Sequence, residues 1–140
     1  LILDNRLRHA GDVISQNDIR KMLKTLKKNG IVWYAPDQNY RGKYSEIVPF
    51  FGIPANSNTA TSRLSKISQA PVLPFFVRRD NSNLKYYVEI HPPLVNYPSQ
   101  DAVQDTLQYH HLIEAQVHKV PDQYLWVHRR FKKRICQPLP

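Results

Sequence analysis

The chain has 140 residues, of which 41% are hydrophobic, so it is long enough for one modest globular core and too short for two. No apolar run reaches about 18 residues and the first residues include charges, so we expect neither a membrane-spanning helix nor a signal peptide in this sequence. Lysine and arginine outnumber aspartate and glutamate by 20 to 11, and the formal charge of +9 favours anionic partners without selecting among nucleic acid, lipid headgroups and acidic proteins.

Helical spacing of apolar residues predicts a first helix over residues 18–29, with Asn17 as its N-cap and Gly30 as its stop. The remaining surface of this helix is basic, through Arg20, Lys21, Lys24, Lys27 and Lys28. We interpret these residues as a solvated face rather than a dedicated binding site. The continuous apolar run at residues 31–34 then predicts a strand buried on both faces, and Pro36 ends it.

The next segment, residues 37–57, combines turn-forming residues with apolar ones, and we expect it to fold back over the sheet or line a pocket. A second helix is predicted over residues 59–69, with Ser57 or Asn58 as its cap. An apolar run at residues 72–77 predicts a second strand, which opens after a proline.

Alternation of apolar and polar residues predicts a third strand over residues 86–90, joined to the second by a turn at residues 80–83. A long helix is predicted over residues 101–119, followed by a strand or extended segment over residues 123–131. This alternation is typical of an α/β fold, so we predict a partial mixed sheet with flanking helices, in a single partial domain over residues 1–140.

Several kinds of site are excluded by residue counts and spacing. With four glycines, neither a phosphate-binding loop nor a dinucleotide fingerprint can be written. The single cysteine, Cys136, excludes an internal disulfide, and the neighbouring His110 and His111 point to different helix faces. We therefore expect no metal and no cofactor. The serine hydrolase elbow and the aromatic RNA-binding motifs are also absent.

Several motifs in order resemble one enzyme family. They are VWYAPDQNYRG, then VPFFG, then two threonines before RLS, then APVLPFFVRR, and finally IEAQVHKVPDQYLWVHRRFKKR. Together they cover nearly the whole chain and resemble the late acyltransferases of lipid A biosynthesis in Gram-negative bacteria, with one departure at Ile135, where the family usually has proline. The final block separates this family from glycerophosphate and lysophospholipid acyltransferases.

The resemblance implies transfer of a fatty acyl chain, usually from acyl carrier protein, to a hydroxyl of an anionic lipid A precursor. It also implies a glycerolipid-acyltransferase-like fold and a place at the cytoplasmic face of the bacterial inner membrane. Family members use a His-x4-Asp/Glu motif as the general base. The six histidines are followed at that spacing by Ile14, Asn96, Ala115, Gln116, Gln123 and Lys133, so none fits. The chain therefore resembles the C-terminal half of such an enzyme, and we expect it to be inactive alone.

The resemblance also implies roles for residues in the first half of the chain. Arg6 and Arg8 match an Arg-x-Arg segment that would bind a phosphate or stabilise the transition state, and pairing with a surface carboxylate is the alternative. The proposed substrate-binding block consists of Asp37, Gln38 and Tyr40. For Asp37 the alternative is a cap or a turn.

The other candidate substrate-binding residues are aromatic, hydroxyl and basic. Phe50 and Phe51 would line an acyl channel, or simply belong to the core. Thr59 and Thr61 would bind an anion at a helix start, or only cap the helix. The basic end of the chain would meet lipid phosphates or the acidic carrier through His128, Arg129, Arg130 and Lys132. A generic solvated tail is the alternative there.

A rival interpretation explains the charge without catalysis. In it, the chain is a small basic module that binds nucleic acid or an anionic membrane. It accounts for the charge of +9 but not for the PDQNY and VPFFG segments. The acyltransferase interpretation predicts an inner-membrane surface as partner and no nucleic acid.

Overall fold

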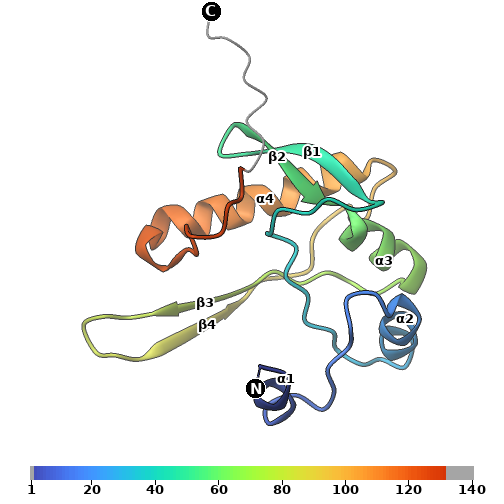
Figure 1. Ribbon diagram of the computed structural model, residues 1–140, viewed down its shortest axis with the longest axis horizontal. Helices are drawn as coiled ribbons and strands as arrows, with labels where there is room; N and C mark the ends of the chain where they lie inside the picture. Colours follow the sequence, from blue (N-terminus) through green and yellow to red (C-terminus); the bar gives the residue numbers. More distant parts are fainter. Residues whose placement is uncertain (1, 132–140) are drawn as a thin grey trace, which may run out of the picture. The chain divides into compact units, whose positions relative to one another are not determined.

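The structure, a computed structural model, describes residues 2–131 (Figure 1). Contacts divide the chain into two compact units, Leu1–Trp33 and Tyr34–Pro140, which are described separately below. The single partial domain over residues 1–140 stays a prediction. In the described part of the chain, no helix has both the length and the apolar character needed to cross a membrane.

The first unit contains two helices, α1 (Ile2–Leu7) and α2 (Ile19–Lys27). Helix α2 confirms the predicted helix, but its cap is Asp18 and not Asn17, since the Asp18 carboxylate accepts the Lys21 N–H at 3.0 Å. The N–H of Gly30 closes the other end by donating to the carbonyl of Thr25 at 2.9 Å. A Cβ at Gly30 would lie 2.7 Å from the Thr25 methyl, so the tight ending depends on glycine.

The predicted buried strand over residues 31–34 is wrong. No strand in the described part of the chain pairs with these residues, and the side chain of Ile31 is 96% exposed. A four-residue apolar run supplies β propensity but does not specify the second strand that must pair with it.

The second unit begins its regular structure with the hairpin of β1 (Ser45–Phe50) and β2 (Ile53–Asn58). Phe51 and Gly52 form the two-residue turn with φ angles of 51° and 70°, as hairpin turns of this length require. No strand is predicted within residues 37–57, so the prediction misses this hairpin. Proline masks the pattern, since Pro49 and Pro54 face each other across the hairpin, where neither needs to donate a hydrogen bond.

A separate hairpin is formed by β3 (Phe75–Arg79) and β4 (Tyr86–Ile90). Strand β4 confirms the predicted third strand, whereas the predicted strand over residues 72–77 is confirmed only from Phe75 onward. Each hairpin is a two-stranded antiparallel sheet by itself among the described residues, so the predicted partial mixed sheet is wrong. The mixture of helices and strands is confirmed. One of the strands expected in that sheet, residues 31–34, does not form.

Three helical segments complete the second unit, namely α3 (Ala60–Ser68), α4 (Ala102–Lys119) and the 3-10 turn η1 (Pro121–Gln123). Both predicted helices are confirmed. The N-cap of α3 is Thr59 and not the predicted Ser57 or Asn58, although the Asn58 side chain accepts the Ala60 N–H at 2.9 Å. Asp101 caps α4 by accepting two N–H groups. The predicted strand or extended segment over residues 123–131 is wrong, because most of this segment forms turns and bends.

Helix α4 packs against β1 and α3, and these contacts form the core (Figure 1). The buried apolar residues of the second unit are Val48, Phe50, Ala55, Leu64, Tyr109 and Val117. The β3–β4 hairpin contributes no residue to this buried set. The core therefore supports the β1–β2 hairpin and its surroundings.

Candidate functional site

A buried polar cluster surrounds Arg130, whose side chain is only 3% exposed. Its guanidinium donates to the carbonyl of Asn56 and, at 2.7 Å, to the hydroxyl of Ser57. The same guanidinium lies 3.3 Å from Nε2 of His110. Arg130 thus joins the end of the described chain to β2 and α4, which fixes the position of a charge inside the second unit.

His110 takes part in this cluster as a neutral imidazole. Its Nδ1 lies 2.8 Å from the carbonyl of Pro49, which can only accept, so Nδ1 carries the proton and Nε2 accepts from Arg130. Burial lowers the pKa of His110; the bond to Pro49 opposes this shift, and the charge of Arg130 adds to it. The imidazole therefore serves here as a hydrogen-bond relay between β1 and Arg130.

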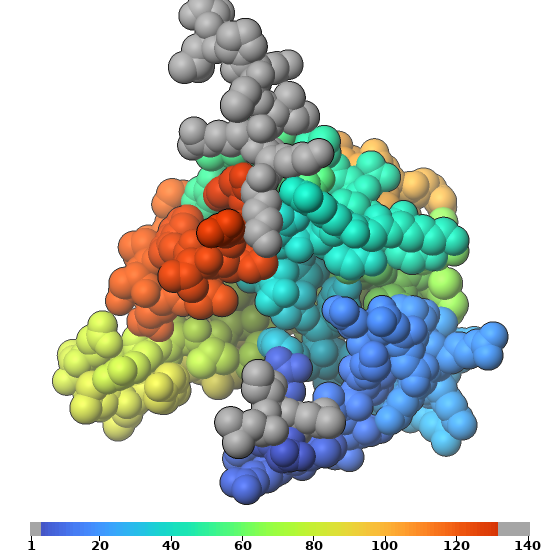
Figure 2. Space-filling model, in the orientation of Figure 1, coloured from blue at the N-terminus to red at the C-terminus, as the bar shows by residue number. Residues whose placement is uncertain are grey.

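Residues 37–40 meet residues 128–130 across the surface of the second unit. The backbone N–H of Asn39 donates to Nε2 of His128 at 2.9 Å, and the N–H of Tyr40 donates to the carbonyl of Asn56 at 3.4 Å. Figure 2 shows the two segments in contact, in cyan and red, although almost ninety positions separate them in the chain.

Asp37 lies close enough to influence two other ionisable groups. Burial raises the pKa of Tyr124 to about 12; the negative charge of Asp37 adds to this rise, and Arg130 opposes it. Burial lowers the pKa of Arg130, and Tyr124 and Asp37 oppose that shift. Asp37 therefore supplies a carboxylate to the same small region as the buried guanidinium.

Aromatic rings lie beneath these polar groups. The Phe50 ring lies 4.9 Å from Phe51 and 5.3 Å from His110, measured between centroids, and the Arg130 guanidinium lies 5.3 Å from Phe50. The N–H of Phe51 donates to the Glu114 carboxylate at 2.6 Å, which fixes the turn between β1 and β2. We call the ring set of Phe50, Phe51, Tyr124, Trp126 and Phe131 the aromatic cluster.

Two buried atoms in this region have no hydrogen-bond partner among the residues that the structure describes. They are Nε of Arg130, a donor, and Oδ1 of Asn39, an acceptor. Buried polar atoms are normally paired, so these two atoms mark hydrogen bonds that the described residues leave unmade. A hydroxyl offers both an acceptor and a donor, and a phosphate offers acceptors, so either chemistry fits part of this pair.

The structure brings most of the predicted substrate-binding residues together. Asp37, Tyr40, Phe50, Phe51 and residues 128–130 lie in this region, whereas Gln38 is exposed at its edge. The binding role of each residue stays a prediction. Lys132 lies outside the described residues.

The remaining predicted residues lie elsewhere. The Thr59 hydroxyl and N–H both donate to the carbonyl of Tyr44, at 3.1 and 3.0 Å, so they hold the start of α3. Thr61 is half-buried on the first turn of α3, near Tyr109. Arg6 and Arg8 are exposed in the first unit.

Three residues that organise the site, His110, Asn39 and Ser57, are absent from the predicted substrate-binding residues, and Ser57 is predicted only as a helix cap. His110 had a usable signal, because it follows Thr106 by four residues and precedes Val117 by seven, on a helix face that is buried in the structure. Asn39 and Ser57 had no such signal, since their contacts connect positions far apart in the chain.

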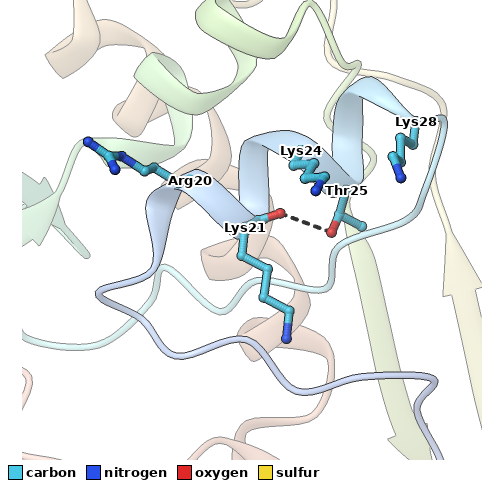
Figure 3. A pocket seen from close by; sticks show the side chains of 5 residues that line it. All are labelled: Arg20, Lys21, Lys24, Thr25 and Lys28. Atoms are coloured by element: carbon cyan, nitrogen blue, oxygen red, sulfur yellow. Dashed lines mark hydrogen bonds between the residues drawn. The ribbon is translucent and has the colours of Figure 1, made fainter.

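The first unit has its own surface feature, a basic pocket along α2. Arg20, Lys21, Lys24 and Lys28 line it together with Thr25, whose hydroxyl donates to the carbonyl of Lys21 at 3.0 Å (Figure 3). Lys21 also pairs with Asp12 at 2.6 Å. The pocket is a positively charged surface suited to an anionic partner.

Comparison with known proteins gives matches over most of the chain. The family model for bacterial lipid A biosynthesis acyltransferases matches residues 1–133. The lipid A biosynthesis lauroyltransferase of Escherichia coli (strain K12) is 36% identical over 130 residues, which are 92% of this chain and 42% of the relative. The palmitoleoyltransferase of the same organism is 37% identical over 133 residues, again 92% and 42%, and its myristoyltransferase is 27% identical over 130 residues. The chain thus spans about two fifths of the length of these curated relatives.

Proposed function

Since this chain belongs to the bacterial lipid A biosynthesis acyltransferase family, we propose that it forms the acceptor-binding and acyl-binding part of an enzyme that transfers a fatty acyl chain to a lipid A precursor. The observation that carries the proposal is the meeting of residues 37–40 with residues 128–130 above the aromatic cluster. Polar groups for an acceptor and apolar rings for an acyl chain then lie side by side.

The chemistry assigns a role to each part of the site. Asp37 and the free atoms of Asn39 and Arg130 would hold acceptor hydroxyls or phosphates, and Phe50 and Phe51 would contact the acyl chain. The donor would be acyl carrier protein, and the enzyme would work at the cytoplasmic face of the inner membrane. The net charge of +9 supports both, since the carrier and the membrane surface are acidic.

The chain carries no His-x4-Asp/Glu motif, so we propose that a segment outside it supplies the general base. The chain alone is then inactive. The reading frame before Leu1 should encode this motif within about one domain length, and its absence there would contradict the assignment of the parent protein as a family enzyme.

A chimera tests the proposal. The chain would replace the matched segment of the Escherichia coli lauroyltransferase, and acyl transfer from acyl carrier protein to a lipid A precursor would be measured. We expect an active chimera, and we expect Asp37→Ala to lower its kcat/KM by about 10- to 100-fold, because a substrate contact is lost.

Matched controls make this result specific. Asp122→Ala also removes a carboxylate of the second unit, an exposed one where Asp37 is half-buried, and should leave kcat/KM unchanged. A chimera that unfolds cooperatively but transfers no acyl group would contradict the proposal. So would acyl transfer by the chain alone.

The basic pocket on α2 favours a second candidate function, binding of nucleic acid without catalysis. Filter binding of DNA and RNA over a range of salt concentrations separates the two functions. Tight binding that survives physiological salt and is lost in Lys24→Glu would support the second function. We expect weak binding that salt abolishes.

A further inference from the structure

The β3–β4 hairpin has one apolar face that nothing in the described chain covers. Cross-strand pairing places Phe75 and Val77 opposite Ile90 and Val88, and the face ends with Tyr86 opposite the exposed Arg79. Each of these apolar and aromatic side chains is between 42% and 69% exposed. A contiguous apolar surface of this kind is typical of an interface.

On the opposite face of the hairpin, the side chains contact one another. Arg78 pairs with Glu89 at 3.2 Å and lies over the Tyr87 ring at 4.5 Å, while Phe76 packs edge-on against His91. The two faces therefore differ in kind. One is closed by a charge pair and ring contacts, and the other is open and apolar apart from Arg79 at its end.

The backbone of β4 is also open on its outer edge. The N–H of His91 donates to the carbonyl of Pro74, and the N–H of Asp80 donates to the carbonyl of Lys85, so the residue pairs at both ends of the hairpin are hydrogen-bonded. Between these ends, every second pair along the ladder is hydrogen-bonded. This alternation turns the backbone groups of Tyr86, Val88 and Ile90 away from β3. In the described part of the chain, no other element hydrogen-bonds to them.

The edge of β3 is treated differently. At Arg79, the Gln123 side chain accepts the backbone N–H at 2.7 Å and donates to the backbone carbonyl at 2.7 Å. At this residue the amide occupies the place that a neighbouring strand would take, whereas no described residue bonds to the outward backbone groups of Phe75 and Val77. Strand β4 has no such cover, and its exposed face carries neither charge nor proline, the usual protection of a sheet edge.

We propose that β4 receives a further strand, and its apolar face a packed layer, from the part of the acyltransferase domain that the longer relatives carry outside the match. The matched residues make up 42% of the lauroyltransferase, so the relatives contain a larger segment able to supply both. A lipid surface would cover the apolar side chains but leave the outward N–H and C=O groups of β4 unpaired, which favours a protein strand. An isolated two-stranded hairpin is also marginal in water.

The test measures binding and needs no catalysis, so it rests on family membership and not on the proposed acyl transfer. The part of the Escherichia coli lauroyltransferase outside the match is produced as a separate polypeptide with a solubility tag, and its affinity for the 140-residue chain is measured. We expect saturable binding. Val88→Arg should weaken it about tenfold or more, because burying an unpaired charge is costly.

A second variant addresses the edge itself. Val88→Pro removes an outward N–H that the hairpin does not use, so it should weaken binding while β3 and β4 stay paired. Val127→Arg is the matched control, since Val127 is 85% exposed and lies outside the hairpin. If Val88 variants lower the thermal midpoint of the chain, Tyr86→Lys at the strand end replaces them.

Three results would overturn the proposal. The first is no binding of the lauroyltransferase segment, and the second is binding that Val88→Arg and Val127→Arg weaken equally. The third is a different occupant of this face. It would be indicated if the lauroyltransferase segment does not bind and Val88→Arg abolishes either binding to lipid vesicles or self-association of the chain. The chimera can be active or inactive in each case, so the two proposals fail independently.

Discussion

At the scale of single residues, Arg130 has the largest predicted effect on stability. Its guanidinium contacts the Asn56 carbonyl, the Ser57 hydroxyl and the His110 ring at once. This needs the planar arrangement of N–H groups that an ammonium group does not have. We expect Arg130→Lys to lower the free energy of unfolding by about 3 kcal/mol. Chemical denaturation measures this loss, with Arg129→Lys at an exposed neighbouring arginine as the control. Equal effects of the two variants would contradict a structural role for the buried cluster.

His110 makes stability depend on pH. Burial lowers its pKa in the folded chain below the value of about 6.5 in the unfolded chain, so the unfolded state binds the proton more readily. The contribution of His110 is therefore fully present above about pH 6.5 and is lost as the pH falls through the lower folded value. Thermal midpoints measured from pH 7.5 downward should show this loss.

His110→Gln removes the titrating group and supplies the control for that pH series. Its midpoint at pH 7.5 should be lower than that of the unaltered chain, because the bonds to Pro49 and Arg130 are disturbed. Its midpoint should then fall less steeply on acidification. Parallel pH curves for the two proteins would show that another group is responsible.

At the scale of elements, Asp105 joins two helices and a loop. Its carboxylate accepts the Ser62 hydroxyl from α3 and the Ser99 N–H at 2.9 Å, and it is 3% exposed on α4. Asp105→Asn places an amide donor among these donors, and we expect a loss of about 2 kcal/mol in unfolding free energy. Denaturant titration measures it. Asp122→Asn, at an exposed carboxylate, should change stability by less than about 0.5 kcal/mol.

The sequence predicts the helices better than the strands, for a physical reason. Helices α2, α3 and α4 lie within about two residues of prediction because periodicity and caps are local properties. The runs at residues 31–34 and 123–131 have the composition of strands but lack partners. A strand forms only when a second segment pairs with it, so the sequence of either run alone does not predict whether it becomes a strand.

The candidate site shows the same limit. The resemblance assigns Asp37 and Arg130 to one family motif each. It does not predict that Arg130 is buried against His110 and Ser57. That arrangement depends on contacts over more than seventy residues for Ser57 and twenty for His110. The chemistry of the residues was predictable, and their burial was not.

At the scale of the whole molecule, the two units differ in how much core they hold. Met22 is the one buried apolar residue of the first unit among the described residues, whereas the second unit has a continuous set on α3, α4 and the β1–β2 hairpin. We expect residues 34–140, produced alone, to unfold cooperatively with a midpoint within a few degrees of the full chain. Circular dichroism melting measures it. Loss of cooperativity in the shorter chain would show that the second unit depends on the first.

The side-chain amide of Gln123 bonds the backbone of Arg79 and so makes the two edges of the β3–β4 sheet unequal for the addition of further strands. Gln123 obstructs β3 only at Arg79, near the turn, while the whole outer edge of β4 is open among the described residues, so addition beyond β4 meets the smaller obstacle. An unwanted pairing of two copies through β4 would use up the β4 edge of each copy and stop at a closed dimer. Replacing Gln123 by a residue that cannot bridge an edge would open the second side, and the same hairpin could then stack end to end without limit, as fibres do.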